Sequence, residues 1–408
     1  MNVKQKRDAL LSENLCDHCL GRQFAKLGHG LENYERGAIA REVEDLDEDS
    51  FVRENIPGGV SAGGSCEVCQ GVFEDLEKYT DMVEDAFGRH ELSTFLVGIR
   101  PPEEVVAAEE DLWDDYGIEW TEQIKTELSR LIGKRIEEDL DIEVDFKRPD
   151  IMAVIDMRDG KERVELQVNS LLVYGQYNKY SREIPQTEWH CRNCRGSGCE
   201  ECDWTGKQYQ TSVQEIIQEP FMRETRAIEA KFHGGGREDV DARCLGKREF
   251  VLELVEPLNR DIDLDSLAEE VNSGEKVEIF NVRPADKDEI AEIKQKHADK
   301  TYRAKVSLGE EVKDSELEKL QQLVGTVEQD TPQRVDHRRA EKTREREVYD
   351  ASWERTGEGE IELEVAAEAG TYIKELVHGD EGRTQPNVSG LLGTRAQVEE
   401  LDVIDIEK

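Results

Sequence analysis

The stretch Gly234–Arg243, with the sequence GGGREDVDAR, is the part of the chain around which the rest can be organised. Its three glycines allow sharp or left-handed turns that other residues resist, and charged side chains follow at once. The strand-like segment Glu249–Val255 comes soon afterwards. A loop of this kind can lift a reactive carboxylate, such as that of Asp239, out of a rigid sheet. Taken alone, the stretch also fits an ordinary surface turn with solvated charges, so other parts of the chain must separate the two interpretations.

The composition limits the kind of protein. The 408 residues suffice for two or three domains with their own cores. The formal net charge is −40 and is spread through the whole chain, which favours a protein of a salt-rich, halophilic cytosol. In molar salt the Debye length falls to about 3 Å, so this charge does not exclude an anionic partner such as RNA. The sequence shows no apolar run of membrane-spanning length and no signal peptide, and we therefore expect a cytoplasmic protein without a membrane partner.

Eight of the nine cysteines form Cys-x-x-Cys pairs, which in a reducing cytosol indicate metal sites. Two pairs form a compact knuckle at residues 190–203, and four thiolates there predict a closed, structural zinc site. Iron–sulfur ligation and vestigial cysteines are the alternatives. The two earlier pairs can share a second zinc ion if the chain between them folds back; otherwise they are unrelated turns. The predicted zinc ligands are Cys16, Cys19, Cys66, Cys69, Cys191, Cys194, Cys199 and Cys202.

Hydrophobic periodicity and the cysteine spacing divide the chain into three predicted domains. Residues 1–71 form a cysteine-bearing segment, residues 72–182 a compact α+β unit, and residues 183–408 a mixed α/β domain that begins with the knuckle. Two places depart from the acidity of the chain. The segment Tyr174–Arg182 has three tyrosines, two cations and no acid, which fits either base stacking or a strand edge. Residues 331–346 carry six Lys and Arg against three acids, which fits a phosphate-tracking surface or a salt-bridged helix face.

Three separated motifs together resemble those of the pseudouridine synthases. Gly236–Arg243 resembles their catalytic motif, Tyr302–Ala304 their second motif, and Gly370–Leu376, with the sequence GTYIKEL, their third. With the THUMP-like region and the segment Thr331–Arg339, the chain is similar over nearly its whole length to archaeal tRNA pseudouridine synthases of the Pus-ten type, which act on T-loop uridines 54 and 55. The resemblance implies an α+β fold, with an N-terminal zinc-binding THUMP-like domain. A catalytic domain on a mixed, mainly antiparallel sheet flanked by helices would follow.

The resemblance also implies the residues of the site. Asp239 is the expected nucleophile, because breaking the N-glycosidic bond builds positive character on the sugar that a carboxylate can attack or stabilise. Lys374, where many synthases carry Arg, is expected to pair with Asp239 and keep it ionised. Asp241 is better explained as a structural hydrogen-bonding partner near the turn. The expected substrate-binding residues are Tyr302, which would stack on the flipped uracil, Tyr372, Arg237, Arg334, Arg338 and Arg339.

The expected partner is the T-loop and T-arm of tRNA, modified at uridine 54, at uridine 55 or at both, and no DNA partner and no catalytic cofactor are expected. Two other functions stay open. A zinc-dependent RNA-binding protein without catalysis would keep the cysteines and the basic segment, but it would not explain the three motifs. Another THUMP-type tRNA-modifying enzyme, for thiolation or methylation, would need a phosphate-cradling or Gly-rich cofactor loop, and the sequence shows no convincing one.

Overall fold

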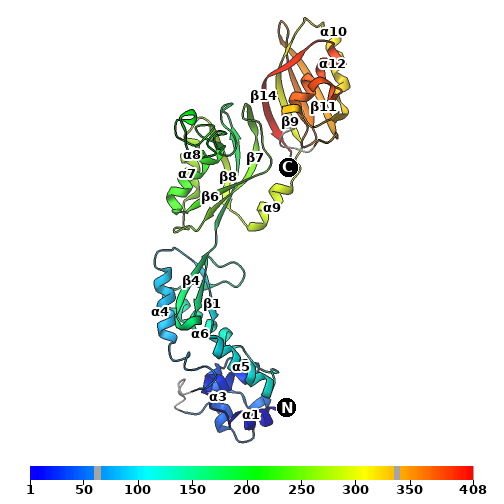
Figure 1. The fold of residues 1–408 in the computed structure, drawn as a ribbon. Helices are drawn as coiled ribbons and strands as arrows, with labels where there is room; N and C mark the ends of the chain where they lie inside the picture. Colours follow the sequence, from blue (N-terminus) through cyan, green and yellow to red (C-terminus); the bar gives the residue numbers. More distant parts are fainter. Residues whose placement is uncertain (59–65, 335–340, 408) are drawn as a thin grey trace. The chain divides into compact units, whose positions relative to one another are not determined.

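The computed structural model describes residues 1–58, 66–334 and 341–407, and it divides into two compact units (Figure 1). The first unit comprises Met1–Ser170 and Glu256–Arg260, and the second comprises Leu171–Val255 and Asp261–Lys408. Each unit has its own sheet and its own buried apolar clusters, so each is described by itself. Among the described residues, no helix is both long and apolar enough to cross a membrane.

The first unit is built on a four-stranded sheet in the order β2-β1-β3-β4, in which β3 and β4 are antiparallel and the other pairs parallel. Side chains alternate along β1, which buries Phe95, Val97 and Ile99 as the period of a strand requires. Two helices, α4 and α6, pack against the sheet and against each other. The strands are β1 (Thr94–Arg100), β2 (Glu143–Val144), β3 (Ile151–Asp156) and β4 (Arg163–Val168), and these helices are α4 (Leu76–Phe87) and α6 (Ile124–Leu140).

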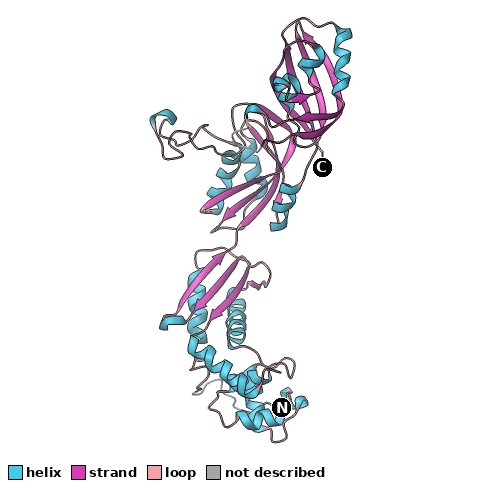
Figure 2. Ribbon diagram, turned by 45° about the vertical axis from the view of Figure 1, so that its right-hand side comes forward, coloured by secondary structure: helices cyan, strands magenta, loops and turns pink. Residues whose placement is uncertain are grey.

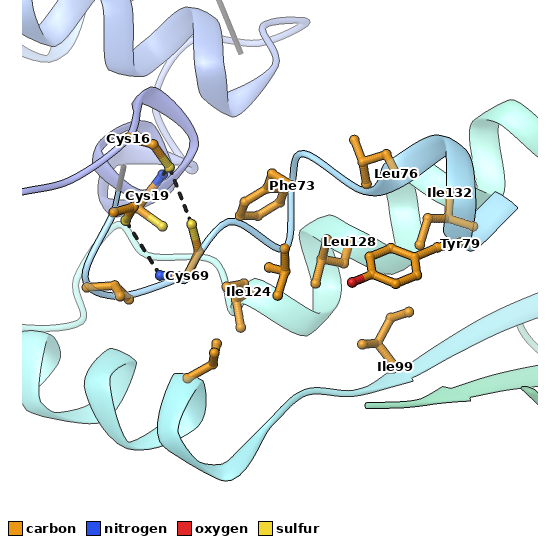
Figure 3. Packing of buried hydrophobic residues seen from close by; sticks show 14 of the residues in the cluster. Cys16, Cys19, Cys69, Phe73, Leu76, Tyr79, Ile99, Ile124, Leu128 and Ile132 are labelled. Atoms are coloured by element: carbon orange, nitrogen blue, oxygen red, sulfur yellow. Dashed lines mark hydrogen bonds between the residues drawn. The ribbon is translucent and has the colours of Figure 1, made fainter. Parts of the chain in front are cut away.

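Short helices surround the first two cysteine pairs in the same unit. The cysteines belong to one continuous apolar cluster with Phe73, Leu76 and residues of α6 (Figure 3). The additional helices are α1 (Val3–Leu10), α2 (Asp17–Gly21), α3 (Asn33–Glu42) and α5 (Glu103–Tyr116). The cysteine pairs are therefore part of the core of this unit and do not lie on its surface.

The second unit is built on a ten-stranded sheet in the order β13-β10-β11-β12-β9-β14-β7-β5-β8, with β6 added beside β7. Only β7 and β14 among these described neighbours are parallel; the others are antiparallel. The strands are β5 (Leu171–Lys179), β6 (Glu229–Gly234), β7 (Ala242–Val255), β8 (Val277–Pro284), β9 (Lys300–Leu308), β10 (Gly325–Gln329), β11 (Arg344–Gly357), β12 (Glu360–Ala367), β13 (Thr384–Gln385) and β14 (Ala396–Ile406).

Helices pack on this sheet in two groups (Figure 2). One group covers the strands β5 to β8 and encloses a core with Ile217, Phe221 and Leu267, while the other packs with β9 to β12 and β14 around Leu320 and Leu376. The helices are α7 (Val213–Thr225), α8 (Leu264–Asn272), α9 (Lys287–Gln295), α10 (Asp314–Leu317), α11 (Ile373–His378) and α12 (Val388–Leu392). The predicted class, α+β with a mainly antiparallel sheet flanked by helices, is confirmed.

Several local expectations differ from the structure. Gly117 has φ +79° and ends α5, so Ile118 is an exposed apolar residue between α5 and α6. The predicted second domain ends at residue 182, whereas β5 pairs with β7 and β8 in the sheet of the second unit. Within the basic segment, Arg344 and Arg346 lie on strand β11, and residues 335–340 lie outside the described residues.

Candidate active site

The stretch around Asp239 forms the turn between the antiparallel strands β6 and β7 (Figure 1). Gly236 has φ +85°, and a Cβ atom there would come within 2.9 Å of the guanidinium of Arg248, so this position requires glycine. The N–H of Gly235 continues the ladder by donating to the carbonyl of Glu249 at 2.9 Å. The glycines therefore let the chain turn sharply at the end of β6, and residues 236–241 form the loop that leads into β7.

On the inner side of this loop, the side chain of Glu238 meets the buried side chains of Tyr177, Lys179 and Arg248, and we call these four residues the buried layer. The hydroxyl of Tyr177 donates to the Glu238 carboxylate at 3.0 Å, and Arg248 Nε forms an ion pair with it at 3.0 Å. Burial lowers the pKa of Lys179, an effect that nearby carboxylates such as that of Glu238 only partly offset. The buried layer thus compensates one carboxylate with two cations and a phenol.

Lys179 connects the buried layer to the backbone of the loop. Its ammonium group donates to the carbonyls of Ile184 at 3.0 Å, Asp239 at 3.0 Å and Val240 at 2.9 Å. Three carbonyl acceptors use all three protons of the ammonium group. The two peptide carbonyls that follow the Asp239 α-carbon are consequently fixed from below, and the Asp239 side chain starts from a defined position.

The Asp239 carboxylate itself lies on the open side of the loop, with 38% of its side chain exposed. Arg334 Nη1 is 3.3 Å from the carboxylate, and Lys374 Nζ is 3.4 Å from Oδ2. The shorter contacts of Lys374 are with Asp241, whose two oxygens each accept a hydrogen bond at 2.8 Å. Burial raises the pKa of Asp241, but this bond and the positive charge of Lys374 outweigh burial and lower it. Lys374 therefore serves both aspartates and holds Asp241 more closely.

A cavity of about 610 Å³ opens above Asp239. Tyr302 lines it from β9 and Tyr372 from the residue before α11. Burial raises the pKa of Tyr302 to about 12, so its phenol is neutral near pH 7. Eight lysine and arginine residues line the cavity against two carboxylates. In a chain of net charge −40, this inversion marks the cavity as a place suited to an anionic ligand.

The structure thus brings six of the eight predicted catalytic and substrate-binding residues to one cavity. Arg237 is exposed, and its guanidinium lies over the ring of Trp189 at 4.7 Å from the centroid. The predicted residues that line the cavity are Asp239, Lys374, Tyr302, Tyr372, Arg334 and Arg237. Two further predicted residues, Arg338 and Arg339, lie outside the described residues.

Sequence reasoning missed the buried layer. The segment Tyr174–Arg182 was expected to be a stacking surface or a strand edge, but β5 is an interior strand between β7 and β8, and both Tyr177 and Lys179 are fully buried. One signal was available, because residues two apart on a strand share a face, so Tyr177 and Lys179 point the same way. Nothing local indicated that this face lies beneath the stretch Gly234–Arg243.

Both cysteine quartets have the geometry of a tetrahedral metal site. With Zn–S bonds of about 2.3 Å, two thiolates of a tetrahedron lie about 3.8 Å apart. The Sγ atoms of Cys16 and Cys69 are 3.6 Å apart (Figure 3), and those of Cys194 and Cys202 are 3.8 Å apart. In each quartet all four Sγ atoms lie within 4.8 Å of one another. Both sets of four cysteines can therefore hold structural zinc, and neither would leave an open position for catalysis.

Comparison with known proteins gives matches over both units of the chain. Residues 172–407 match the family profile described as "Pus10, C-terminal", and residues 79–156 match "Pus10 THUMP domain, archaeal". The chain is 41% identical to the tRNA pseudouridine synthase Pus10 of Methanothermobacter marburgensis, over 100% of this chain and 99% of that protein. It is 40% identical to the protein of the same name from Halorubrum lacusprofundi, over 96% and 93%, and 36% identical to that from Methanopyrus kandleri, over 99% and 98%.

The class of protein follows from these matches together with the fold: a pseudouridine synthase, an isomerase, that carries a THUMP domain. More narrowly, the chain belongs to the Pus10 family.

Proposed function

We propose that this protein is a tRNA pseudouridine synthase that isomerises uridine 54, uridine 55 or both in the T-loop of tRNA, with Asp239 as the nucleophile. The observation that carries the proposal is the half-exposed Asp239 carboxylate at a cavity where lysine and arginine outnumber carboxylates eight to two. The relatives that match over nearly their whole length are named tRNA pseudouridine synthases, which supports tRNA as the substrate. The dispersed acidic charge supports an enzyme that works in a salt-rich cytoplasm.

The reaction uses one carboxylate, and the product has the same composition as the substrate. An oxygen of Asp239 bonds to C1′ of the ribose while the N1–C1′ bond breaks and its electron pair stays on the uracil. The uracil turns, its C5 atom bonds to C1′, and the bond between C1′ and Asp239 breaks. The proton on C5 leaves to solvent and N1 takes up a proton, so the product is an isomer of the substrate. Each turnover therefore releases one hydrogen from C5.

The other cavity residues bind the extruded nucleotide in this proposal. Tyr302 stacks on the uracil, which must leave its place in the T-loop at a cost of a few kcal/mol. Tyr372 lines the same space, and Arg237, Arg338 and Arg339 contact phosphates of the RNA. Lys374 lies beside the nucleophile and keeps Asp241 in place. The zinc ions support the fold, and the chemistry itself needs no cofactor.

The test is tritium release from tRNA transcripts whose uridines carry tritium at C5, measured in molar KCl with the full chain. Wild type is expected to release tritium and Asp239→Ala to release none, while Asp265→Ala, an exposed aspartate on α8, serves as the matched control. Transcripts in which one of the two uridines is replaced by cytidine assign the position. Normal release from Asp239→Ala contradicts the assigned nucleophile, and tRNA binding without release from wild type supports a non-catalytic RNA-binding protein.

A further inference from the structure

A buried carboxylate lies directly beside the site but carries none of the roles described so far. Glu375 follows Lys374 on α11, and only 1% of the residue is exposed. It accepts hydrogen bonds from Arg334 Nε at 2.7 Å and from Nη2 at 3.4 Å. A buried carboxylate is costly without a cation, so Glu375 and Arg334 need each other in this position. Glu375 therefore fixes one edge of the Arg334 guanidinium.

The remaining nitrogen of that guanidinium faces the nucleophile. Arg334 Nη1 lies 3.3 Å from both carboxylate oxygens of Asp239, so Arg334 bridges Glu375 and Asp239. Burial lowers the pKa of Arg334, but the bond and charge of Glu375 and the charge of Asp239 outweigh burial and raise it, so the bridge stays charged. A planar guanidinium can contact two carboxylates at once in fixed directions, and a lysine ammonium cannot reproduce this fork.

Lys374 cannot orient Asp239 alone, because its two 2.8 Å hydrogen bonds go to Asp241 while Asp239 is 3.4 Å away. The orientation of the Asp239 carboxylate thus depends on Arg334 at least as much as on Lys374. Glu375 and Lys374 are adjacent residues of α11, so one helical turn controls both cations that flank the nucleophile.

We propose that Glu375 is a positioning residue for the isomerisation, which acts through Arg334 and sets the direction in which the Asp239 carboxylate faces the ribose. The inference rests on the proposed function, in which Asp239 is the nucleophile. It also changes the role expected of Arg334. The three nitrogens of its guanidinium are already directed at two carboxylates, so its main effect is on the rate of the chemical step and not on the affinity for RNA phosphates.

The test measures single-turnover tritium release and, separately, the dissociation constant for tRNA by filter binding, both with the full chain in molar KCl. For Glu375→Gln we expect a rate constant lower by about tenfold, the size of one lost charge-assisted hydrogen bond, and a dissociation constant within about twofold of wild type. Arg334→Gln is expected to lose at least as much rate. The double variant is expected to be no slower than Arg334→Gln alone, because Glu375 acts only through Arg334.

The matched control is Glu270→Gln, which breaks an exposed Arg–Glu pair with Arg223, at 3.0 and 2.6 Å, away from the cavity; its rate is expected to equal that of wild type. A wild-type rate for Glu375→Gln, or losses that multiply in the double variant, would overturn the proposal. So would an Arg334→Gln variant that binds tRNA more weakly but reacts at full rate.

If circular dichroism shows that Glu375→Gln does not fold, Arg334→Lys decides the question. It keeps the charge and removes the fork, so we expect a lower rate at unchanged tRNA affinity, and a full rate would overturn the proposal. Failure of the proposed function has a different signature, because wild type itself would then release no tritium.

Discussion

Two adjacent carboxylates, Glu238 and Asp239, lie on opposite sides of the same turn and differ in burial and in ion pairing. We call the side of Glu238 the buried side of the turn and the side of Asp239 its open side. The Glu238 side chain is fully buried and is compensated by Arg248, Tyr177 and Lys179. The Asp239 side chain is 38% exposed and has two cations at 3.3 and 3.4 Å, contacts that are longer than those of a strong ion pair. The two carboxylates therefore have different roles. Glu238 stabilises the loop, and Asp239 stays accessible, as the proposed nucleophile must be.

The comparison predicts that substitutions on the open side of the turn remove activity but hardly change the stability of the protein. Asp239→Asn is expected to show the largest effect. Loss of the nucleophile is expected to lower the single-turnover rate by about 10⁴-fold or more. Because the carboxylate is partly exposed and loosely paired, the free energy of unfolding should change by less than about 1 kcal/mol. Tritium release and urea unfolding at fixed KCl measure the two effects. A variant that loses several kcal/mol would show that Asp239 is structural as well.

Substitutions on the buried side of the turn are expected to lower the stability of the protein. Arg248→Met should cause the largest loss. The substitution removes the cation that lies 3.0 Å from the buried Glu238 carboxylate and leaves it with Lys179, at 3.9 Å, and the Tyr177 hydroxyl. Breaking a buried ion pair by removing one partner costs about 3–5 kcal/mol. Urea unfolding of the variant is compared with that of Arg223→Met, which removes an exposed arginine and is expected to change stability by less than about 1 kcal/mol. Equal stability of the two variants would contradict the assigned role of the buried layer.

Lys179→Met tests the connection between the two sides. Three backbone carbonyls lose their donor, which should cost about 2–3 kcal/mol of stability in urea unfolding. Because two of these carbonyls belong to Asp239 and to the next residue, Val240, we also expect kcat to fall while KM changes little. A variant that is destabilised but reacts at the wild-type rate would show that the loop keeps its shape without Lys179, and the two sides would then be independent.

The smallest effect concerns Cys244, a buried thiol on β7 close to Arg248 and Glu238. Burial raises the pKa of this thiol from its ordinary value of 9.0 to about 11. The thiol in the unfolded chain ionises first, so its contribution to stability is complete below pH 9 and is lost as the pH rises toward 11. Between pH 8 and pH 10, Cys244→Ala should therefore lose about 1 kcal/mol less than wild type. Parallel pH dependences of urea unfolding would contradict a buried, protonated thiol.

The open side of this turn could be predicted from the sequence, and the buried side could not. Asp239, Tyr302 and Lys374 occur in three short motifs whose order and residue types resemble those of known synthases, so their meeting at one cavity was expected. The role of Lys179 depends on the pairing of β5 with β7 and β8, and such long-range register leaves no local mark. The contact of Arg334 with Glu375 joins two residues 41 positions apart and is invisible for the same reason.

In the fold, too, features that depend on neighbouring residues could be predicted from the sequence, whereas the details of contacts between distant residues could not. The strand-like segment Glu249–Val255 was correctly indicated and lies within β7, because the alternation of side chains along a strand is a local property. Lys374 was expected to pair with Asp239, and it lies nearby, but its closest hydrogen bonds go to Asp241. The competition between two carboxylates for one ammonium depends on differences of a few tenths of an ångström, which a motif cannot encode.

The first cysteine quartet has a consequence for chain connectivity. Cys16 and Cys19 meet Cys66 and Cys69 at one point, so a metal ion there would close the intervening chain into a loop in the native state. The entropy of closing a flexible loop grows only with the logarithm of its length, and each doubling costs about 0.6 kcal/mol. The free energy of closing the quartet would thus depend only weakly on the length of the chain between Cys19 and Cys66. The quartet would therefore join two distant parts of the chain at an entropic cost that is nearly independent of how many residues separate them.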